Sequence, residues 1–125
     1  MSRKSKATLV RNFSQEDFDF FANLSGDNNP IHVDPDFSAQ TRFGRPVAHG
    51  LLLCSVLRGL IEELLPGARM TEQSVMFPAP TFAGEPMCFS IALTDEDDSG
   101  TAVRLEVLRV SDGTATCQGH ARVLT

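Results

Sequence analysis

The sequence feature that most constrains the fold is one long apolar segment followed by a change in hydrophobic period. Residues 48–65 place apolar side chains around most of a helix, and only Ser55, Arg58 and Glu62 form a narrow polar stripe. A helix with so little polar surface is buried rather than laid on the outside of a protein. We therefore expect one long central helix, ended by the Pro-Gly pair that follows it.

After this segment the apolar residues alternate with polar ones. Three runs, 87–94, 103–107 and 115–123, have the period of two that is typical of half-buried strands, and turn residues separate them. Residues 70–80 indicate another strand, and residues 7–13 an edge strand. Helices that are segregated from antiparallel strands make an α+β fold. We expect a curved antiparallel sheet wrapped around the central helix.

Two shorter helices are expected before the central one. Residues 14–25 begin with the capping pattern Ser14-x-x-Asp17 and show a helical apolar face. Gly26 ends this helix, and the Asp-Asn-Asn-Pro that follows favours a turn. Residues 35–43 then predict a second short helix with a proline in its first turn.

Length and composition limit the class of protein. The 125 residues, 42% of them hydrophobic and 22% charged, indicate a single folded domain over residues 1–125, with residues 1–6 as a flexible tail. No apolar run reaches the roughly 18 residues of a membrane span, and the N-terminus lacks the apolar core of a signal peptide. The three cysteines form no CxxC pair and leave one unpaired in any disulfide scheme, which favours a reduced, cytoplasmic setting.

The charge distribution argues against nucleic acid as a partner. The net charge is −5, but four of the eleven basic residues lie in the first eleven positions, where no acidic residue occurs. Residues 12–125 therefore carry seven arginines against sixteen acidic residues, a net charge of −9. Nucleic-acid binding needs a broad basic face. A small anionic ligand is still compatible with the sequence where a few arginines converge.

The residues with the clearest chemical meaning lie between the first helix and the central one. Asp27 and His32 flank a proline turn, so that a carboxylate and an imidazole can share one water and exchange a proton near neutral pH. His49 and Gly50 follow at the expected start of the central helix. Free N–H groups and the positive end of the helix dipole bind a developing oxyanion there, and a glycine lets a carbonyl approach closely.

These residues carry a resemblance to a known family. The stretch SGDNNPIHVDPDFSAQTRFGRPVAHGLLL, residues 25–53, resembles the signature of the MaoC-like, (R)-specific enoyl-CoA hydratases, and the D-x4-H spacing with the downstream RPVAHG is its most specific part. The resemblance implies a hot-dog fold and the addition of water to a trans-2-enoyl thioester, giving the (R)-3-hydroxyacyl thioester, or the reverse dehydration. It also implies a coenzyme A or acyl-carrier-protein substrate, no further cofactor, no metal and a homodimer or higher homo-oligomer.

By that resemblance each motif residue receives a role. Asp27 and His32 hold and activate the water, and the N–H of Gly50 polarises the thioester carbonyl. His49 either closes the loop before the central helix or acts beside the substrate, and Asn29 either forms the turn or contacts the ligand. Several family members carry a serine on the third turn of the central helix, where this sequence has Arg58. Ser55 lies one turn earlier on the same stripe. Arg58 either narrows the acyl pocket, pairs with Glu62, or selects an acyl chain that bears a carboxylate.

Other interpretations of these residues stay open. Arg42 and Arg45 flank a Phe-Gly turn near the motif and bind the phosphates of coenzyme A or are ordinary solvated loop charges. His32 and His49, together with Asp34, match no compact metal-binding pattern.

Two alternative functions fit the same fold. A hot-dog acyl-CoA thioesterase shares the architecture but not the D-x4-H motif. A non-catalytic acyl-thioester-binding module is kept open by the arginine on the central helix.

Overall fold

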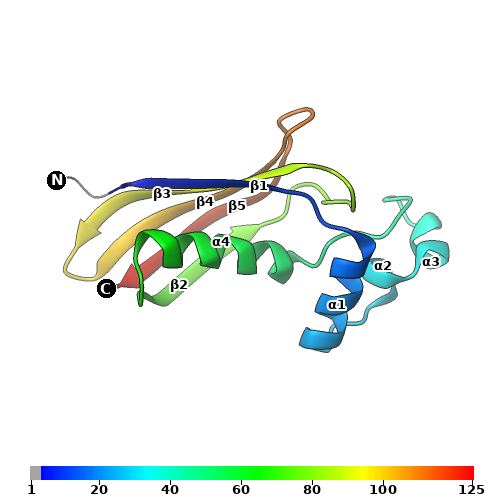
Figure 1. Cartoon of the computed structure of the whole chain (residues 1–125), viewed down its shortest axis with the longest axis horizontal. Helices are drawn as coiled ribbons and strands as arrows, with labels where there is room; N and C mark the ends of the chain where they lie inside the picture. Colours follow the sequence, from blue (N-terminus) through cyan, green and yellow to red (C-terminus); the bar gives the residue numbers. More distant parts are fainter. Residues whose placement is uncertain (1–3) are drawn as a thin grey trace.

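The computed structural model describes residues 4–125, and its five strands form one antiparallel sheet with the order β1-β3-β4-β5-β2. The longest helix, α4, runs along one face of this sheet (Figure 1). This confirms the expected α+β architecture of one long helix against an antiparallel sheet. The elements in chain order are β1 (Lys6–Arg11), α1 (Gln15–Ser25), α2 (Pro30–Val33), α3 (Pro35–Ala39), α4 (Gly50–Leu64), β2 (Arg69–Met76), β3 (Met87–Asp97), β4 (Gly100–Arg109) and β5 (Ala115–Leu124).

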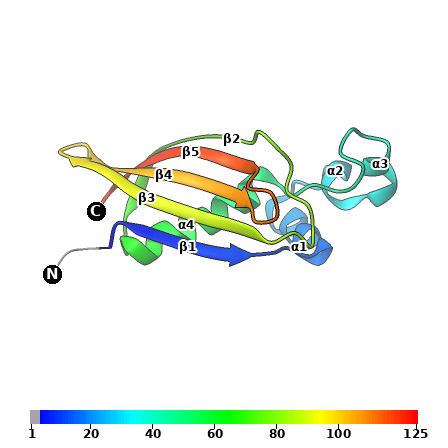
Figure 2. The ribbon, with the colours of Figure 1, turned by 90° about the horizontal axis from the view of Figure 1, so that it is seen from above.

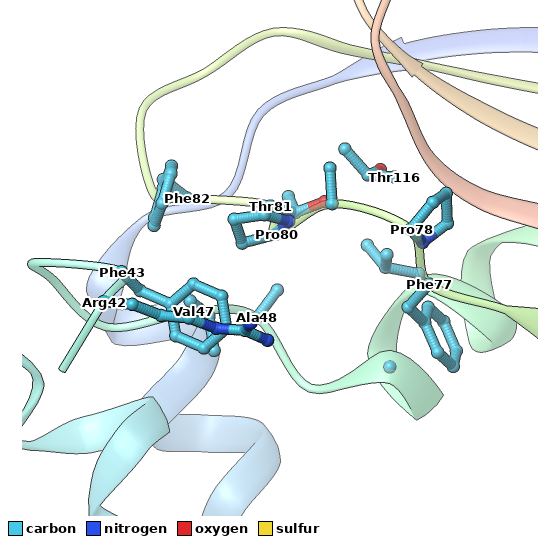
Figure 3. A pocket seen from close by; sticks show the side chains of 13 residues that line it. Arg42, Phe43, Val47, Ala48, Phe77, Pro78, Pro80, Thr81, Phe82 and Thr116 are labelled. Carbon is cyan, nitrogen blue, oxygen red and sulfur yellow. The ribbon is translucent and has the colours of Figure 1, made fainter.

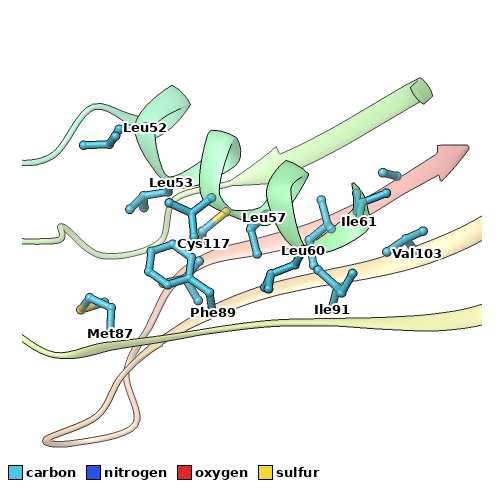
Figure 4. Close-up of a cluster of buried hydrophobic side chains, with 14 of the residues drawn as sticks. Leu52, Leu53, Leu57, Leu60, Ile61, Met87, Phe89, Ile91, Val103 and Cys117 are labelled. Atoms are coloured by element: carbon cyan, nitrogen blue, oxygen red, sulfur yellow. The ribbon is translucent and has the colours of Figure 1, made fainter. Parts of the chain in front are cut away.

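The hydrophobic core fills the space between α4 and the sheet. Figure 4 shows one face of the helix directed at the inward side chains of β3, β4 and β5. The alternation seen in the sequence places every second strand residue in this layer, which leaves the intervening residues on the outer face. The core residues of the helix and sheet include Leu53, Leu57, Leu60, Ile61, Met87, Phe89, Ile91, Val103, Leu105, Val107, Cys117, Ala121 and Val123.

The prediction that α4 is buried around most of its circumference is met only in part by the single chain, because the open face is wider than the predicted polar stripe. Leu51 is 66% exposed, and Ser55, Gly59 and Glu62 are exposed on the same side. The sheet covers one face of the helix, and residues 4–125 provide no second layer over the other. The polar stripe is therefore part of a wider open face that also includes an apolar side chain.

The hairpins agree with the strand predictions. β3 and β4 pair directly through the turn at 97–100, and β4 pairs with β5. β1 is an edge strand paired with β3, and β2 is the opposite edge, paired with β5. The strand expected at 70–80 ends at Met76, and the segment after it crosses over the start of α4.

The N-terminal helices lie together at one end of the sheet, beyond the N-terminus of α4 (Figures 1 and 2). The capping box is confirmed: Ser14 Oγ accepts from the N–H of Asp17, and the Asp17 carboxylate accepts from the N–H of Ser14. The expected turn at 27–30 leads directly into the four-residue helix α2, which was not predicted. The helix expected at 35–43 is the shorter α3, which ends at Ala39.

Two further expectations concern the chain ends and the membrane. The flexible tail was predicted too long, because Lys6 opens β1 and Ser5 O accepts a hydrogen bond from the N–H of Leu93 at 2.8 Å; residues 1–3 of that tail lie outside the described residues. Within residues 4–125, the helices are too short or too polar to cross a bilayer.

Candidate functional site

Helix α2 holds the central histidine of the site. Asn29 is its N-cap, and Asn29 Oδ1 accepts a hydrogen bond from the N–H of Ile31 at 3.1 Å. Pro30 occupies the first turn, where its missing N–H costs nothing. This short helix turns His32 back towards Asp27, the residue that follows the C-cap of α1. Since the side-chain oxygen of Asn29 caps α2, its observed role is to shape this turn.

The hydrogen bonds of His32 define its tautomer. Nδ1 lies 2.9 Å from the carbonyl oxygen of Val47, and a carbonyl only accepts, so Nδ1 carries the proton. Nε2 of the neutral ring then has a free lone pair, and it lies 3.7 Å from Oδ2 of Asp27. This distance is too long for a direct hydrogen bond, while one water at about 2.8 Å can contact both atoms. The Asp27 side chain is 55% exposed and the His32 side chain 14%, so the gap between them opens to solvent.

His49 lies beneath this pair and is 2% exposed. Its Nε2 donates to the backbone carbonyl of Asp27 at 2.8 Å. Its ring stacks on that of His32, with the centroids 3.8 Å apart and the planes at 23°. The Phe21 ring of α1 also packs against His49 in an edge-on arrangement, with the ring centroids 4.9 Å apart. Burial is the main cause of a lowered pKa of His49, and the adjacent imidazole lowers this pKa further.

Gly50 is the first residue of α4, so its N–H is among the helix N–H groups that have no partner within the helix. A Cβ on Gly50 would lie 2.6 Å from Cζ of Phe77. Only a glycine therefore fits beneath this ring in the observed arrangement. Phe77 is 46% exposed and covers the start of the helix from the segment after β2.

A pocket of about 610 Å³ lies next to Gly50 (Figure 3). Arg42 and Phe43 form one wall, and the segment from Phe77 to Phe82 forms the other, so that the lining is mainly apolar. Asp27 and His32 do not line this pocket. The Asp27–His32 pair and the pocket are connected by the segment 47–50. The carbonyl of Val47 binds His32, and Val47, Ala48 and Gly50 line the pocket.

The two loop arginines have different surroundings. Arg42 lines the pocket, is exposed and lies over the Phe43 ring at 4.9 Å. Arg45 lies over the Phe82 ring at 4.1 Å and forms an ion pair with Glu85 at 3.6 Å. The charge of Arg45 is thus partly compensated within the chain, whereas Arg42 presents its guanidinium at the pocket.

The structure does not bring Ser55 and Arg58 to the motif residues. Ser55 Oγ donates to the carbonyl of Leu52 within α4. Arg58 Nη2 donates to the carbonyl of Ala68 at 2.6 Å, and Nη1 lies 4.0 Å from Glu62 Oε2. Arg58 is eight residues beyond Gly50, about 12 Å along the helix. Its contacts therefore attach the end of α4 to the loop before β2.

In the structure, Asp27 takes the place of Asp34 in the candidate metal-binding group, and the geometry of this group does not suit a metal ion. Asp34 caps α3 by accepting from the N–H groups of Asp36 and Phe37. Asp27, His32 and His49 do bring ligand atoms within 4.8 Å of one another. However, imidazole lone pairs lie in the ring plane, and two stacked rings at 23° cannot direct them to one ion. This arrangement suits proton transfer better than metal binding.

Four supporting contacts were not predicted from the sequence. Gln15 Nε2 donates to the carbonyl of His32 at 2.9 Å, and Val47 fixes the ring of that histidine. Phe21 packs on His49, and Phe77 packs on Gly50. Each of these contacts joins segments distant in sequence, so no local pattern indicates them.

Comparison with known proteins gives consistent matches. The sequence model of the family described as MaoC like domain matches residues 1–114. The (R)-specific enoyl-CoA hydratase of Aeromonas caviae is 41% identical over 91 residues, which cover 71% of this chain and 68% of that protein. The (R)-specific enoyl-CoA hydratase of Rhodospirillum rubrum is 30% identical over 120 residues, covering 94% of this chain and 83% of that protein.

A solved structure matches over almost the same extent. The (R)-hydratase from A. caviae, described as involved in PHA biosynthesis, superposes with a TM-score of 0.89 at 32% identity. The match covers 99% of this chain and 96% of that one. The expected hot-dog fold is thereby confirmed.

Proposed function

Because the chain belongs to the MaoC-like domain family, we propose that it catalyses (R)-specific hydration of a trans-2-enoyl-CoA to the (R)-3-hydroxyacyl-CoA, or the reverse dehydration. The observation that carries the proposal is the lone pair on Nε2 of His32, directed at the Asp27 carboxylate across a 3.7 Å gap. A water in this gap has a base on one side and a hydrogen-bond acceptor on the other.

The reaction needs one oriented water, one proton carrier and one oxyanion site. In the hydration direction, Nε2 of His32 takes a proton from the water as the water oxygen bonds to C3. The Asp27 carboxylate orients the water and stabilises the imidazolium that forms. The imidazolium then returns a proton to C2, so that H and OH are added to the double bond. The pair of Asp27 and His32, called the dyad below, thereby ends in its starting state. The proposed reaction uses no cofactor beyond the thioester carrier.

The thioester carbonyl is assigned to the N-terminus of α4. The Gly50 N–H donates to the carbonyl oxygen, and the helix dipole stabilises the enolate that develops when C3 is attacked. The support for this assignment is the position of Gly50, which lies on the pocket wall and in the segment that also fixes His32.

The pocket and its arginine suit an acyl thioester. Its largely apolar walls suit an acyl chain, and the Arg42 guanidinium at its edge suits a phosphate of coenzyme A or of an acyl-carrier-protein arm. Arg45 contributes less to this charge because Glu85 is its partner. We place the reaction in the cytoplasm, with neither nucleic acid nor membrane as a partner.

The open face of α4 supports assembly into a homodimer or larger homo-oligomer. Leu51 is 66% exposed there, one residue beyond the oxyanion site, and a second copy laid on this face buries it. Sedimentation of the protein tests the assignment: a dimer is expected, and a monomer at micromolar concentration contradicts it. Leu51→Asp is expected to shift the equilibrium towards monomer.

The central experiment measures loss of enoyl absorbance over a panel of trans-2-enoyl-CoA chain lengths, including carboxylated acyl groups. Asp27→Asn and His32→Ala are expected to lower kcat/KM by at least about 10²-fold, because each removes a partner of the water. Arg104→Gln, on the sheet, serves as a surface control. Wild-type rates in both dyad variants, with the fold retained, would reject the proposed mechanism.

The two alternatives give different signals in the same assay. A thioesterase releases free thiol, which a trapping reagent detects, whereas hydration releases none. A binding module is stabilised against heat by acyl-CoA but consumes none of the panel. If Arg58 selects a carboxylated acyl chain, Arg58→Ser loses that substrate and gains crotonyl-CoA. The contacts of Arg58 with Ala68 and Glu62 instead favour unchanged selectivity.

A further inference from the structure

We infer that His49 is a positioning residue for the dyad: as the neutral Nε2–H tautomer, it holds the backbone carbonyl of Asp27 and thereby sets the distance between that carboxylate and His32. The inference rests on the proposed function, because it concerns how the same site is kept in working geometry. His49 does not line the pocket and is 2% exposed, so it acts through Asp27 rather than on substrate.

The first support is the geometry of Asp27. Its side chain is more than half exposed, and its backbone follows the left-handed Gly26 that ends α1. Two local contacts hold Asp27: its N–H donates to Ser25 Oγ at 3.1 Å, and its Oδ1 accepts from the N–H of Asn29 at 3.4 Å. The 2.8 Å bond from His49 is a contact from a distant segment, and it ties this turn to the start of α4. Without it, the carboxylate is attached to the helices by local turns alone.

The second support is the buried environment of the ring. The His49 ring stacks on that of His32 and also packs against the Phe21 ring, so that it contacts residues of both α2 and α1. Nδ1 is buried and has no hydrogen-bond partner among residues 4–125, which leaves Nε2–H as the one polar contact of the side chain there. A buried lone pair without a partner is costly, so the bond made by Nε2–H is the contact that holds this side chain in its observed tautomer and position.

The third support concerns charge. The titratable groups that face His49 are Asp27 and His32, and α1 contributes only the Phe21 ring. Burial is the largest effect on the pKa of His49 and lowers it, which favours the neutral ring, while the bond to the Asp27 carbonyl raises this pKa. A neutral neighbour leaves the imidazolium of His32 without a like charge at stacking distance. His49 thus provides a rigid contact but does not add a second proton carrier.

Three variants separate the hydrogen bond from the ring. His49→Phe keeps the stacked ring and loses the donor. His49→Gln loses the ring but places an amide N–H at the position of Nε2, and His49→Asn places it at the position of Nδ1. We expect kcat to fall roughly 10- to 100-fold in the Phe and Asn variants with little change in KM, as a dyad displaced by about 1 Å predicts. The Gln variant is expected to recover most of the loss and to keep the acid limb of the kcat/KM pH profile.

Several results overturn the inference. Wild-type kcat in the Phe variant shows that the donor is not needed, and an equal loss in the Gln and Phe variants shows that the donor does not restore function. Loss of the acid limb in the Gln variant makes His49 itself the titrating base. Should the variants not fold, long-range ¹⁵N–¹H NMR of the wild-type histidines decides: a neutral Nε2–H tautomer at pH 7 is expected, and an Nδ1–H or protonated ring contradicts it. Absence of hydration by the wild-type protein would instead reject the proposed function. The NMR measurement would still test the tautomer and charge that we infer for His49.

Discussion

The sharpest test of the oxyanion assignment is Gly50→Ala. The added Cβ lies 2.6 Å from Cζ and 2.8 Å from Cε2 of Phe77, so the ring must retreat by about 1 Å to reach an ordinary carbon–carbon contact. Phe77 is 46% exposed and has room to rotate, and alanine is a better helix former than glycine. We therefore expect the free energy of unfolding to change by less than about 1 kcal/mol.

The effect on catalysis is expected to be much larger. The new methyl occupies the surface from which a thioester carbonyl reaches the Gly50 N–H, so the contact that stabilises the enolate lengthens or is lost. Loss of one oxyanion donor lowers kcat by about 10²- to 10³-fold, equivalent to roughly 2.7–4 kcal/mol of transition-state stabilisation. Urea unfolding gives the first quantity, and hydration of a short enoyl-CoA gives the second.

Two control variants show which change is responsible for the loss of kcat in Gly50→Ala. Gly59→Ala is the same change on the same helix, where nothing in the single chain lies within 4 Å, but Gly59 is on the open face of α4. Once sedimentation shows the wild-type oligomeric state, this variant should keep wild-type kcat. In the double variant Gly50→Ala/Phe77→Ala the ring no longer blocks the methyl. A rate that stays low there shows that the methyl itself obstructs the carbonyl, and a rate that recovers shows that the displaced ring was responsible. Wild-type kcat/KM in Gly50→Ala alone would refute the placement of the thioester at this N–H.

Three further predictions concern stability. Gly119→Ala forces a methyl into the backbone of Ser74 on β2 and should lower the free energy of unfolding by about 1–3 kcal/mol in urea titrations; an unchanged midpoint contradicts the pairing of β2 with β5. Ser14→Ala removes half of the capping box and should cost about 1 kcal/mol, whereas Asn12→Ala, at an exposed position before the cap, should leave the free energy of unfolding nearly unchanged. Burial lowers the pKa of His49 from its usual 6.5, so the unfolded chain takes up a proton that the folded chain does not, and thermal stability should fall as the pH drops below about 6.5. This fall should be shallower in His49→Gln.

The sequence predicts the elements that depend on local patterns. The period of two in 87–94 and 115–123 gives strands of the sheet because a half-buried strand demands that alternation. The capping pattern Ser14-x-x-Asp17 locates the start of α1 because both of its bonds are local. Helix α2 was missed because four residues are too few to show a helical period, and its proline reads equally well as a turn.

The site is predicted in its members but not in its arrangement. Asp27, His32 and Gly50 are indicated by motif spacing, and their assigned roles are still predictions. The stacking of His32 on His49 joins residues 17 positions apart, and it depends on how α1 and α2 pack, which no local pattern records. The open face of α4 is wider than the predicted stripe of Ser55, Arg58 and Glu62, because hydrophobicity shows that a face avoids water but not which chain covers it.

The residues that position the dyad and the residues that form most of the sheet lie in different parts of the chain. The contacts of Asp27, His32 and His49 described above come from residues 15–49, before any of the strands β2 to β5. Substitutions in those strands therefore change how firmly the fold holds without changing the geometry of the proton exchange. If the proposed roles of Asp27 and His32 hold, a chain with the same sheet but an altered stretch between α1 and α4 is expected to keep the fold and lose the hydration activity. This stretch is nevertheless not independent of the rest of the chain, because the N–H of Ala48 donates to the carbonyl of Thr81 and the segment from Phe77 to Phe82 forms a wall of the pocket.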